Sequence, residues 1–299
     1  GYSIGEKNID NVNAGKTLFE LYDLTGKEKY KKAVDLVYSQ IEIMPRCQNE
    51  ARSFWHKDIY PNQVWLDGLY MGQVFYMMYE SRFGGKEHYS DIIKQFKLVR
   101  RNMFNDEKQL YYHAYDESRQ MYWADKTTGL SQNFWLRSMG WYLLALIECL
   151  DAIDQSVYEY YDDLKSLFKE ALKGVLKYQD EKTHLFYQVI DRADVKENYL
   201  ETSGSAMIAY AMLKACRMKA VLAEKYEDNA ISIFEALADN KLEEVDGELK
   251  LGGICSVAGL GGKEKRDGSL KYYFSEPVVY DDHKGVGPFI MAYSEINRL

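Results

Sequence analysis

The chain has 299 residues, of which 46% are hydrophobic, so it is long enough to bury a sizeable core. Its formal net charge of -8 at pH 7 argues against non-specific binding to nucleic acid or to an anionic membrane surface. The sequence has no apolar run of about 18 residues and no signal-peptide pattern. We therefore expect a cytoplasmic protein, unless a leader was removed before residue 1.

Paired helical segments follow one another along the chain. Apolar positions at three- and four-residue spacing predict helices over 10–23, 27–43, 62–83, 86–104, 131–152, 156–179, 203–220, 223–240 and 285–297. The first helix of each pair is richer in apolar and small residues than the second, which favours an inner and an outer ring. A weak repeat, GKEKY at 26–30 and GKEHY at 85–89, supports stacked helical hairpins.

These hairpins predict a single all-α domain over residues 1–299 with the fold of an (α/α)6 barrel, a toroid of inner and outer helices. A six-fold ring needs six inner helices, and the sequence provides five. Either an N-terminal hairpin is missing before residue 1, or the helix count is off by one.

Long polar and aromatic segments separate the hairpins, at 44–61, 105–130, 180–202 and 242–284. Each ends where an inner helix begins, so their unusual residues are expected to gather at one rim of the barrel. All five tryptophans fall between residues 55 and 141. Aromatic rings suit the CH faces of sugars, and helix N-termini favour a carboxylate ligand. This rim is therefore the predicted binding site.

Asp67 is the leading candidate for catalysis because it lies in the aromatic sequence WLDG, between Trp65 and Gly68. Loss of hydration among indole rings favours a protonated carboxyl group, which can act as a general acid. Gly68, without a side chain, would let a ligand approach the backbone. The alternative is an aspartate that only interacts favourably with the helix dipole.

Asp10 opens the first inner helix, and stacked hairpins would bring it close to Asp67. Two neighbouring carboxylates push their pKa values apart, which leaves one protonated and one ionised, as glycosidases require. The alternative role of Asp10 is a helix N-cap.

Basic residues near the same rim could hold an anionic sugar. Arg137 can bind a carboxylate through two parallel hydrogen bonds, although a structural ion pair is the alternative. His56 and Lys57 precede Asp67, and His113 precedes the third inner helix, where it could equally be an ordinary loop residue. Glu201 could be a helix cap.

Other chemistry is less well supported by the sequence. The segment DDHK at 281–284 lacks convincing metal-ligand spacing, and no nucleotide-binding or zinc motif is found. The cysteines are scattered without a CxxC motif, so they are expected to be reduced. They are Cys47, Cys149, Cys216 and Cys255.

The motifs PRCQNEARSFWHKDIYPNQVWLDGLYMG, NFWLRSMGWY, NYLETSGSAMIAYAM and DDHKGVGPFIMAYSE occur in this order. Together they resemble the unsaturated rhamnogalacturonyl hydrolases of glycoside hydrolase family 105. The resemblance implies an (α/α)6 barrel without metal or organic cofactor. It also implies release of 4,5-unsaturated galacturonic acid from the non-reducing end of rhamnogalacturonan or pectin fragments, by protonation of C4 and addition of water at C5.

By motif, the resemblance implies that Asp67 is the proton donor and water activator and that Asp10 is the second catalytic aspartate. It implies contacts with the oligosaccharide substrate for six further residues, which are Trp65, His56, Lys57, His113, Trp135 and Arg137. The sequence departs from the family pattern in two places. The helical hairpin that the family has before the motif of Asp10 is absent here, and the loop at 45–53 is longer.

Three other functions stay open at this level. The chain could be an unsaturated glucuronyl hydrolase acting on glycosaminoglycan disaccharides. It could be an ordinary inverting glycosidase that uses Asp10 and Asp67 at a wider separation. It could also be a sugar-binding toroid without catalysis, in which Asp67 would be replaceable. The sequence does not determine the oligomeric state.

Overall fold

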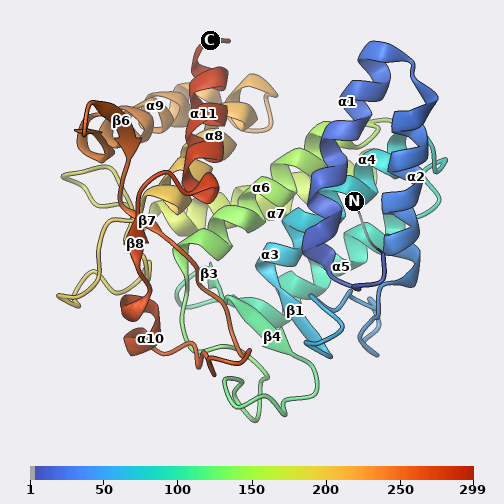
Figure 1. Ribbon diagram of the computed structural model, residues 1–299, viewed down its shortest axis with the longest axis horizontal. Coiled ribbons are helices and arrows are strands. Elements are labelled where there is room, and N and C mark those ends of the chain that lie inside the picture. Colours follow the sequence, from blue (N-terminus) through green and yellow to red (C-terminus); the bar gives the residue numbers. More distant parts are fainter. Residues whose placement is uncertain (1–3) are drawn as a thin grey trace.

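The computed structural model describes residues 4–299 (Figure 1). Helices alternate between an inner and an outer position along the chain. The inner ones are η1 (Ile9–Gly15) with α1 (Lys16–Thr25), α3 (Leu66–Gly68) with η2 (Leu69–Gln73) and α4 (Val74–Arg82), α6 (Leu136–Ala152), α8 (Thr202–Arg217) and α11 (His283–Ile296). The outer ones are α2 (Glu28–Ile43), α5 (Tyr89–Met103), α7 (Tyr158–Leu176) and α9 (Ala223–Lys241).

The burial of the two sets explains their positions. Helix α8 is buried along nearly its whole length, and so is α6, because most of their side chains are apolar or small. The outer helices α7 and α9 bury one stripe and expose charged residues on the other side. Helix α8 packs against α6, α9 and α11. The predicted toroid with an apolar inner ring and a more polar outer ring is confirmed.

Two inner helices begin later than predicted. The second was expected from residue 62, but 63–65 form strand β1 (Gln63–Trp65), which pairs antiparallel with β4 (Ala114–Asp116). The third was expected from residue 131 and begins at Leu136. In both cases the backbone before the helix is tied to a neighbouring loop, and this tertiary pairing overrides the helical periodicity.

Three further pairs of short strands organise the connecting segments. They are β2 (Phe104–Asn105) with β3 (Leu110–Tyr111), β5 (Leu242–Val245) with β6 (Glu248–Leu251), and β7 (Ile254–Cys255) with β8 (Val278–Val279). A short helix, α10 (Leu270–Ser275), lies between β7 and β8 along the chain. These elements carry the rim at the N-terminal ends of the inner helices.

Within residues 4–299 the inner position is filled by five helical segments, in agreement with the count from the sequence. The first and last of them, α1 in blue and α11 in red, stand well apart in Figure 1. All four cysteines are buried and unpaired, as predicted. No helix in the described part of the chain is long and apolar enough to span a membrane.

Candidate active site

An open cavity of about 510 Å³ lies at the N-terminal ends of the inner helices. It receives side chains from η1, α3, α6 and α11 and from the loops that precede them. Its lining comprises Asp10, Asn13, His56, Lys57, Tyr60, Trp65, Asp67, Met71, Trp135, Arg137, Trp141, Val257, Ala258, Gly259, Arg266, His283 and Lys284. Of the eight residues predicted for the site, seven line this cavity and His113 does not.

Asp10 is an ion-pairing residue of the rim, and the cap of its helix is Asn8. The Asn8 side chain accepts a hydrogen bond from the Asp10 backbone N–H, which leaves the Asp10 carboxylate available. Its Oδ2 lies 3.0 Å from Lys57 Nζ and its Oδ1 lies 3.4 Å from His56 Nε2. Burial alone would raise the pKa of Asp10, but His56 and Lys57 together hold it well below its usual range. Asp10 is therefore ionised at neutral pH.

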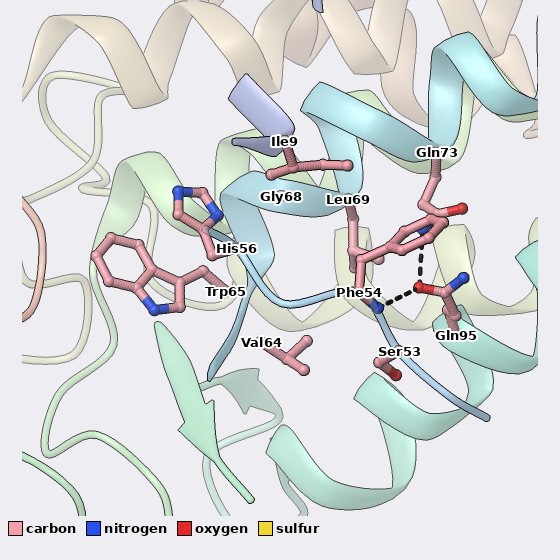
Figure 2. Close-up of a pocket in the computed structure, with 10 residues that line it drawn as sticks. All are labelled: Ile9, Ser53, Phe54, His56, Val64, Trp65, Gly68, Leu69, Gln73 and Gln95. Atoms are coloured by element: carbon pink, nitrogen blue, oxygen red, sulfur yellow. Dashed lines mark hydrogen bonds between the residues drawn. The ribbon is translucent and has the colours of Figure 1, made fainter. Parts of the chain in front are cut away.

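His56 and Trp65 form a stacked aromatic wall of the cavity, with ring centroids 4.5 Å apart and an interplanar angle of 8°. Figure 2 shows the two rings side by side, with Gly68 next to His56. A Cβ at Gly68 would lie 3.1 Å from His56 Nδ1. The space over Gly68 is thus taken by the imidazole, and the expectation that a ligand approaches the backbone there is wrong. Tyr60 stacks on the Trp65 ring at 5.5 Å.

Asp67 begins the second inner helix immediately after β1 and projects into the cavity with 13% of its side chain exposed. Its Oδ2 lies 3.3 Å from His113 Nε2, within ion-pair distance but without the alignment of a hydrogen bond. His113 is fully buried behind Asp67, between the rings of Trp65 and Trp135. The expectation that His113 contacts the substrate is therefore corrected, since this side chain supports Asp67 from behind.

Arg137 is held in place in the first turn of α6, with its side chain 1% exposed. Its Nη1 donates to the Cys255 carbonyl oxygen at 2.5 Å and to Ser203 Oγ at 3.2 Å. Its Nε is buried and has no hydrogen-bond partner among the described residues. A buried donor without a partner, on a side chain that lines the cavity, can donate a hydrogen bond to a carboxylate oxygen of a ligand.

Glu201 is the nearest acidic group to Arg137, at 4.0 Å, but its oxygens are already used. They accept hydrogen bonds from the backbone N–H groups of Ser203, Gly204 and Cys255. Glu201 is thus the N-cap of α8, as the sequence predicted. The charge of Arg137 is only partly compensated by this residue, which leaves the guanidinium available to an anion.

Trp135 and Trp141 complete the aromatic surroundings. Trp135 is the N-cap residue of α6, and its Nε1 donates to Gln188 Oε1 at 3.3 Å, while the Arg137 guanidinium lies over its ring at 4.6 Å. Trp141 stacks on Tyr70 at 4.8 Å. The cavity therefore offers several ring faces together with charged groups, as a polar ligand with CH surfaces requires.

Several lining residues were not identified from the sequence as candidates. Tyr60 belonged to the aromatic cluster, and Met71 follows Asp67 by about one helical turn, so both carried a weak signal. Arg266, His283 and Lys284 belong to the segment 242–284, which the sequence placed at the rim. The structure brings them into the same cavity as Asp67, from about 200 residues away along the chain. Among residues 4–299, no group of three or more His, Cys, Asp or Glu side chains could hold a metal ion.

The sequence is also similar to proteins of a known family. The model of Glycosyl Hydrolase Family 88 matches residues 3–299. The chain belongs to glycoside hydrolase family 88. It is therefore a glycoside hydrolase, and its family membership agrees with a carbohydrate site at the rim.

Structural relatives of this family 88 member include a glycoside hydrolase of family 105 from C. acetobutylicum ATCC 824, with a TM-score of 0.95 and 44% identity. That match covers 100% of this chain and 82% of the other. The expected resemblance to family 105 is thereby confirmed. The unsaturated glucuronyl hydrolase from Bacillus sp. GL1 has a TM-score of 0.71 at 14% identity and shares the fold.

Two sequence relatives are informative. Protein Atu3128 of Agrobacterium fabrum is 38% identical over 232 residues, which is 75% of this chain and 97% of that protein. The unsaturated rhamnogalacturonyl hydrolase YesR of Bacillus subtilis is 25% identical over 217 residues. The match to YesR covers 71% of this chain and 59% of YesR.

Proposed function

We propose that this enzyme is an unsaturated uronyl hydrolase that releases 4,5-unsaturated galacturonic acid from the non-reducing end of rhamnogalacturonan or pectin oligosaccharides. The observation that carries the proposal is that two carboxylates, Asp10 and Asp67, line one cavity with different partners. Asp10 is held ionised between two bases, whereas Asp67 faces one imidazole backed by a phenol. Such a site separates the roles of charge stabilisation and proton transfer.

The chemistry is hydration of the enol ether. Asp67 gives its proton to C4, and positive charge develops at C5 beside the ring oxygen. Water then adds at C5, with Asp67, now ionised, accepting the proton of that water. The resulting hemiketal opens and expels the rest of the sugar chain. The ionised Asp10 carboxylate stabilises the developing positive charge.

The uronate carboxylate is assigned to Arg137, because this guanidinium lines the same cavity and carries a buried Nε–H that has no partner within residues 4–299. The stacked His56 and Trp65 rings and the indole of Trp135 give the sugar apolar faces to contact. Lys57 forms an ion pair with Asp10 at 3.0 Å and therefore acts mainly on that carboxylate.

The choice of a pectin-type substrate is supported by relatives. The 25% identity to YesR, named an unsaturated rhamnogalacturonyl hydrolase, and the 44% identity to a family 105 structure favour it. The likeness to the glucuronyl hydrolase of Bacillus sp. GL1, at 14% identity, supports the fold alone.

The test follows the ultraviolet absorbance of the conjugated C4=C5 double bond. The enzyme is incubated with an unsaturated rhamnogalacturonan disaccharide and, in parallel, with an unsaturated chondroitin disaccharide. Faster loss of absorbance with the first substrate supports the proposal. Preference for the second makes the enzyme a glucuronyl hydrolase. Cleavage of saturated glycosides, with the double bond untouched, would overturn hydration as the reaction.

A further inference from the structure

Tyr273 is a fully buried residue of α10 that does not line the cavity but contacts the group behind Asp67. Its hydroxyl lies 2.8 Å from His113 Nδ1. We propose that Tyr273 is a positioning residue that fixes His113 as the neutral tautomer with its proton on Nε2, facing Asp67. The inference rests on the proposed function, in which Asp67 must carry a proton at the start of each turnover.

The direction of the Tyr273–His113 hydrogen bond follows from burial. Burial, with further contributions from Tyr272 and Asp67, raises the pKa of Tyr273 well above its ordinary value, so the phenol keeps its proton. A buried O–H needs an acceptor, and His113 Nδ1 is the partner found for it among the described residues. The phenol therefore donates, and Nδ1 must present a lone pair.

The second nitrogen of His113 then has a defined role. With Nδ1 accepting, a neutral ring carries its hydrogen on Nε2, which lies 3.3 Å from Asp67 Oδ2. An imidazolium would have hydrogens on both nitrogens, and the hydrogen of the fully buried Tyr273 hydroxyl would lose its acceptor. Tyr273 thus disfavours the charged ring beside Asp67.

The neighbours of this pair are aromatic rings and acidic or weakly acidic groups. The rings packed on His113 are Trp65 and Trp135, both uncharged. The titratable groups that face Tyr273 are Tyr272, Asp67, Cys255 and Asp267. A permanent cation next to Asp67 would stabilise its ionised form and leave it without the proton it must donate. A neutral ring instead places an uncharged Nε2–H dipole 3.3 Å from the carboxyl oxygen, close enough to favour the carboxylate formed after proton transfer without fixing a charge beside it.

Helix α10, which carries Tyr273, is held in place by several contacts. The Ser269 side chain caps the helix by accepting a hydrogen bond from the Tyr272 backbone N–H. Gln188 Nε2 donates a hydrogen bond to the Tyr273 carbonyl oxygen at 3.4 Å. The Tyr273 ring also packs against Trp135, at 6.2 Å. The hydroxyl is therefore held by side-chain packing and backbone contacts, as a positioning group requires.

Two measurements test the proposal. Long-range ¹H–¹⁵N NMR of the histidine rings reports the tautomer directly, with the His113 signals assigned by their loss in His113→Gln. We expect the Nε2–H form in the wild type and a mixture with the Nδ1–H or charged form in Tyr273→Phe. In Tyr273→Phe, kcat should fall on the order of 10- to 100-fold, the usual effect of losing a group that orients a catalytic side chain. KM should change little, because Tyr273 does not line the cavity.

The alkaline limb of the kcat profile should also move to lower pH in Tyr273→Phe, since a more readily charged ring favours ionised Asp67. Tyr142→Phe is the matched control, because it removes one hydroxyl from another fully buried tyrosine outside the cavity. It should leave the pH profile unchanged.

Two results would overturn the assignment. They are an Nδ1–H tautomer in the wild type, and a Tyr273→Phe enzyme whose histidine signals and pH profile match those of the wild type. Failure of the proposed function looks different, because the wild type would then leave the C4=C5 double bond intact whichever tautomer the NMR spectrum shows.

Discussion

Asp10 and Asp67 begin neighbouring inner helices and line the same cavity, yet their surroundings differ. Asp10, with 37% of its side chain exposed, contacts His56 and Lys57 and stays ionised. Asp67, with 13% exposed, contacts the imidazole of His113 instead, and the other nitrogen of that ring contacts the Tyr273 hydroxyl. Two chemically identical side chains at one rim can therefore have different roles, because the rim loops supply each of them with different partners.

The largest expected effect comes from Asp67→Asn, which removes the proton donor but keeps the shape of the side chain. We expect a folded protein whose turnover of the unsaturated disaccharide falls by about 10²- to 10⁴-fold. The decay of ultraviolet absorbance measures it. Asp58→Asn is a suitable control because Asp58 is exposed in the preceding loop and does not line the cavity. Full activity in Asp67→Asn would remove this residue from catalysis.

In Asp10→Asn, kcat should fall on the order of 10²-fold, because the substitution removes the negative charge beside the developing cation.

The effect of Asp10→Asn on the free energy of unfolding should depend on pH. The folded-state pKa of Asp10 lies below its ordinary value of 3.8, so the ionised group contributes stability that is present above pH 3.8 and lost as the pH falls below it. Urea unfolding should show Asp10→Asn less stable than wild type at pH 6, with the difference shrinking towards pH 3. A constant difference would contradict the ion pairs.

A substrate change tests Arg137 without altering the fold. Methyl esterification of the unsaturated uronate removes the charge that Arg137 would bind. We expect kcat/KM of the wild type to fall about 10- to 100-fold, as for loss of a charge-assisted hydrogen bond. In Arg137→Met the acid and the ester should react at similar rates. If Arg137→Met still preferred the acid by the wild-type factor, another cation would hold the carboxylate.

The smallest effect is expected from Lys57→Met, which leaves Asp10 with His56 as its remaining basic partner. The pKa of Asp10 should rise towards its ordinary value, because one of the two lowering charges is gone. The acid limb of the pH profile of kcat should therefore move to higher pH, by about one pH unit. Lys94→Met, at an exposed residue of α5 that does not line the cavity, is the matched control. An unshifted acid limb would mean that His56 alone maintains the charge of Asp10.

Much of the fold could be predicted from the sequence because helical periodicity is a local property. The mostly apolar or small residues of α6 and α8 indicate inner helices, and the charged faces of α7 and α9 indicate outer ones. The first residues of α3 and α6 were predicted less accurately. They depend on backbone pairing with distant loops, such as Trp65 with Ala114, which no local pattern reveals.

The sequence by itself determined the ring of paired helices, the rim at which the aromatic and charged residues gather, and Asp10 and Asp67 as its two carboxylates. Only the tertiary structure decided what each carboxylate contacts. The ion pairs of Asp10 with His56 and Lys57, the burial of His113 behind Asp67 and the phenol of Tyr273 all follow from contacts between separate segments of the rim. The physical reason is that a side chain's character is set by its immediate neighbours, and at this rim the neighbours come from distant parts of the chain, such as His113 and Tyr273, which are 160 residues apart.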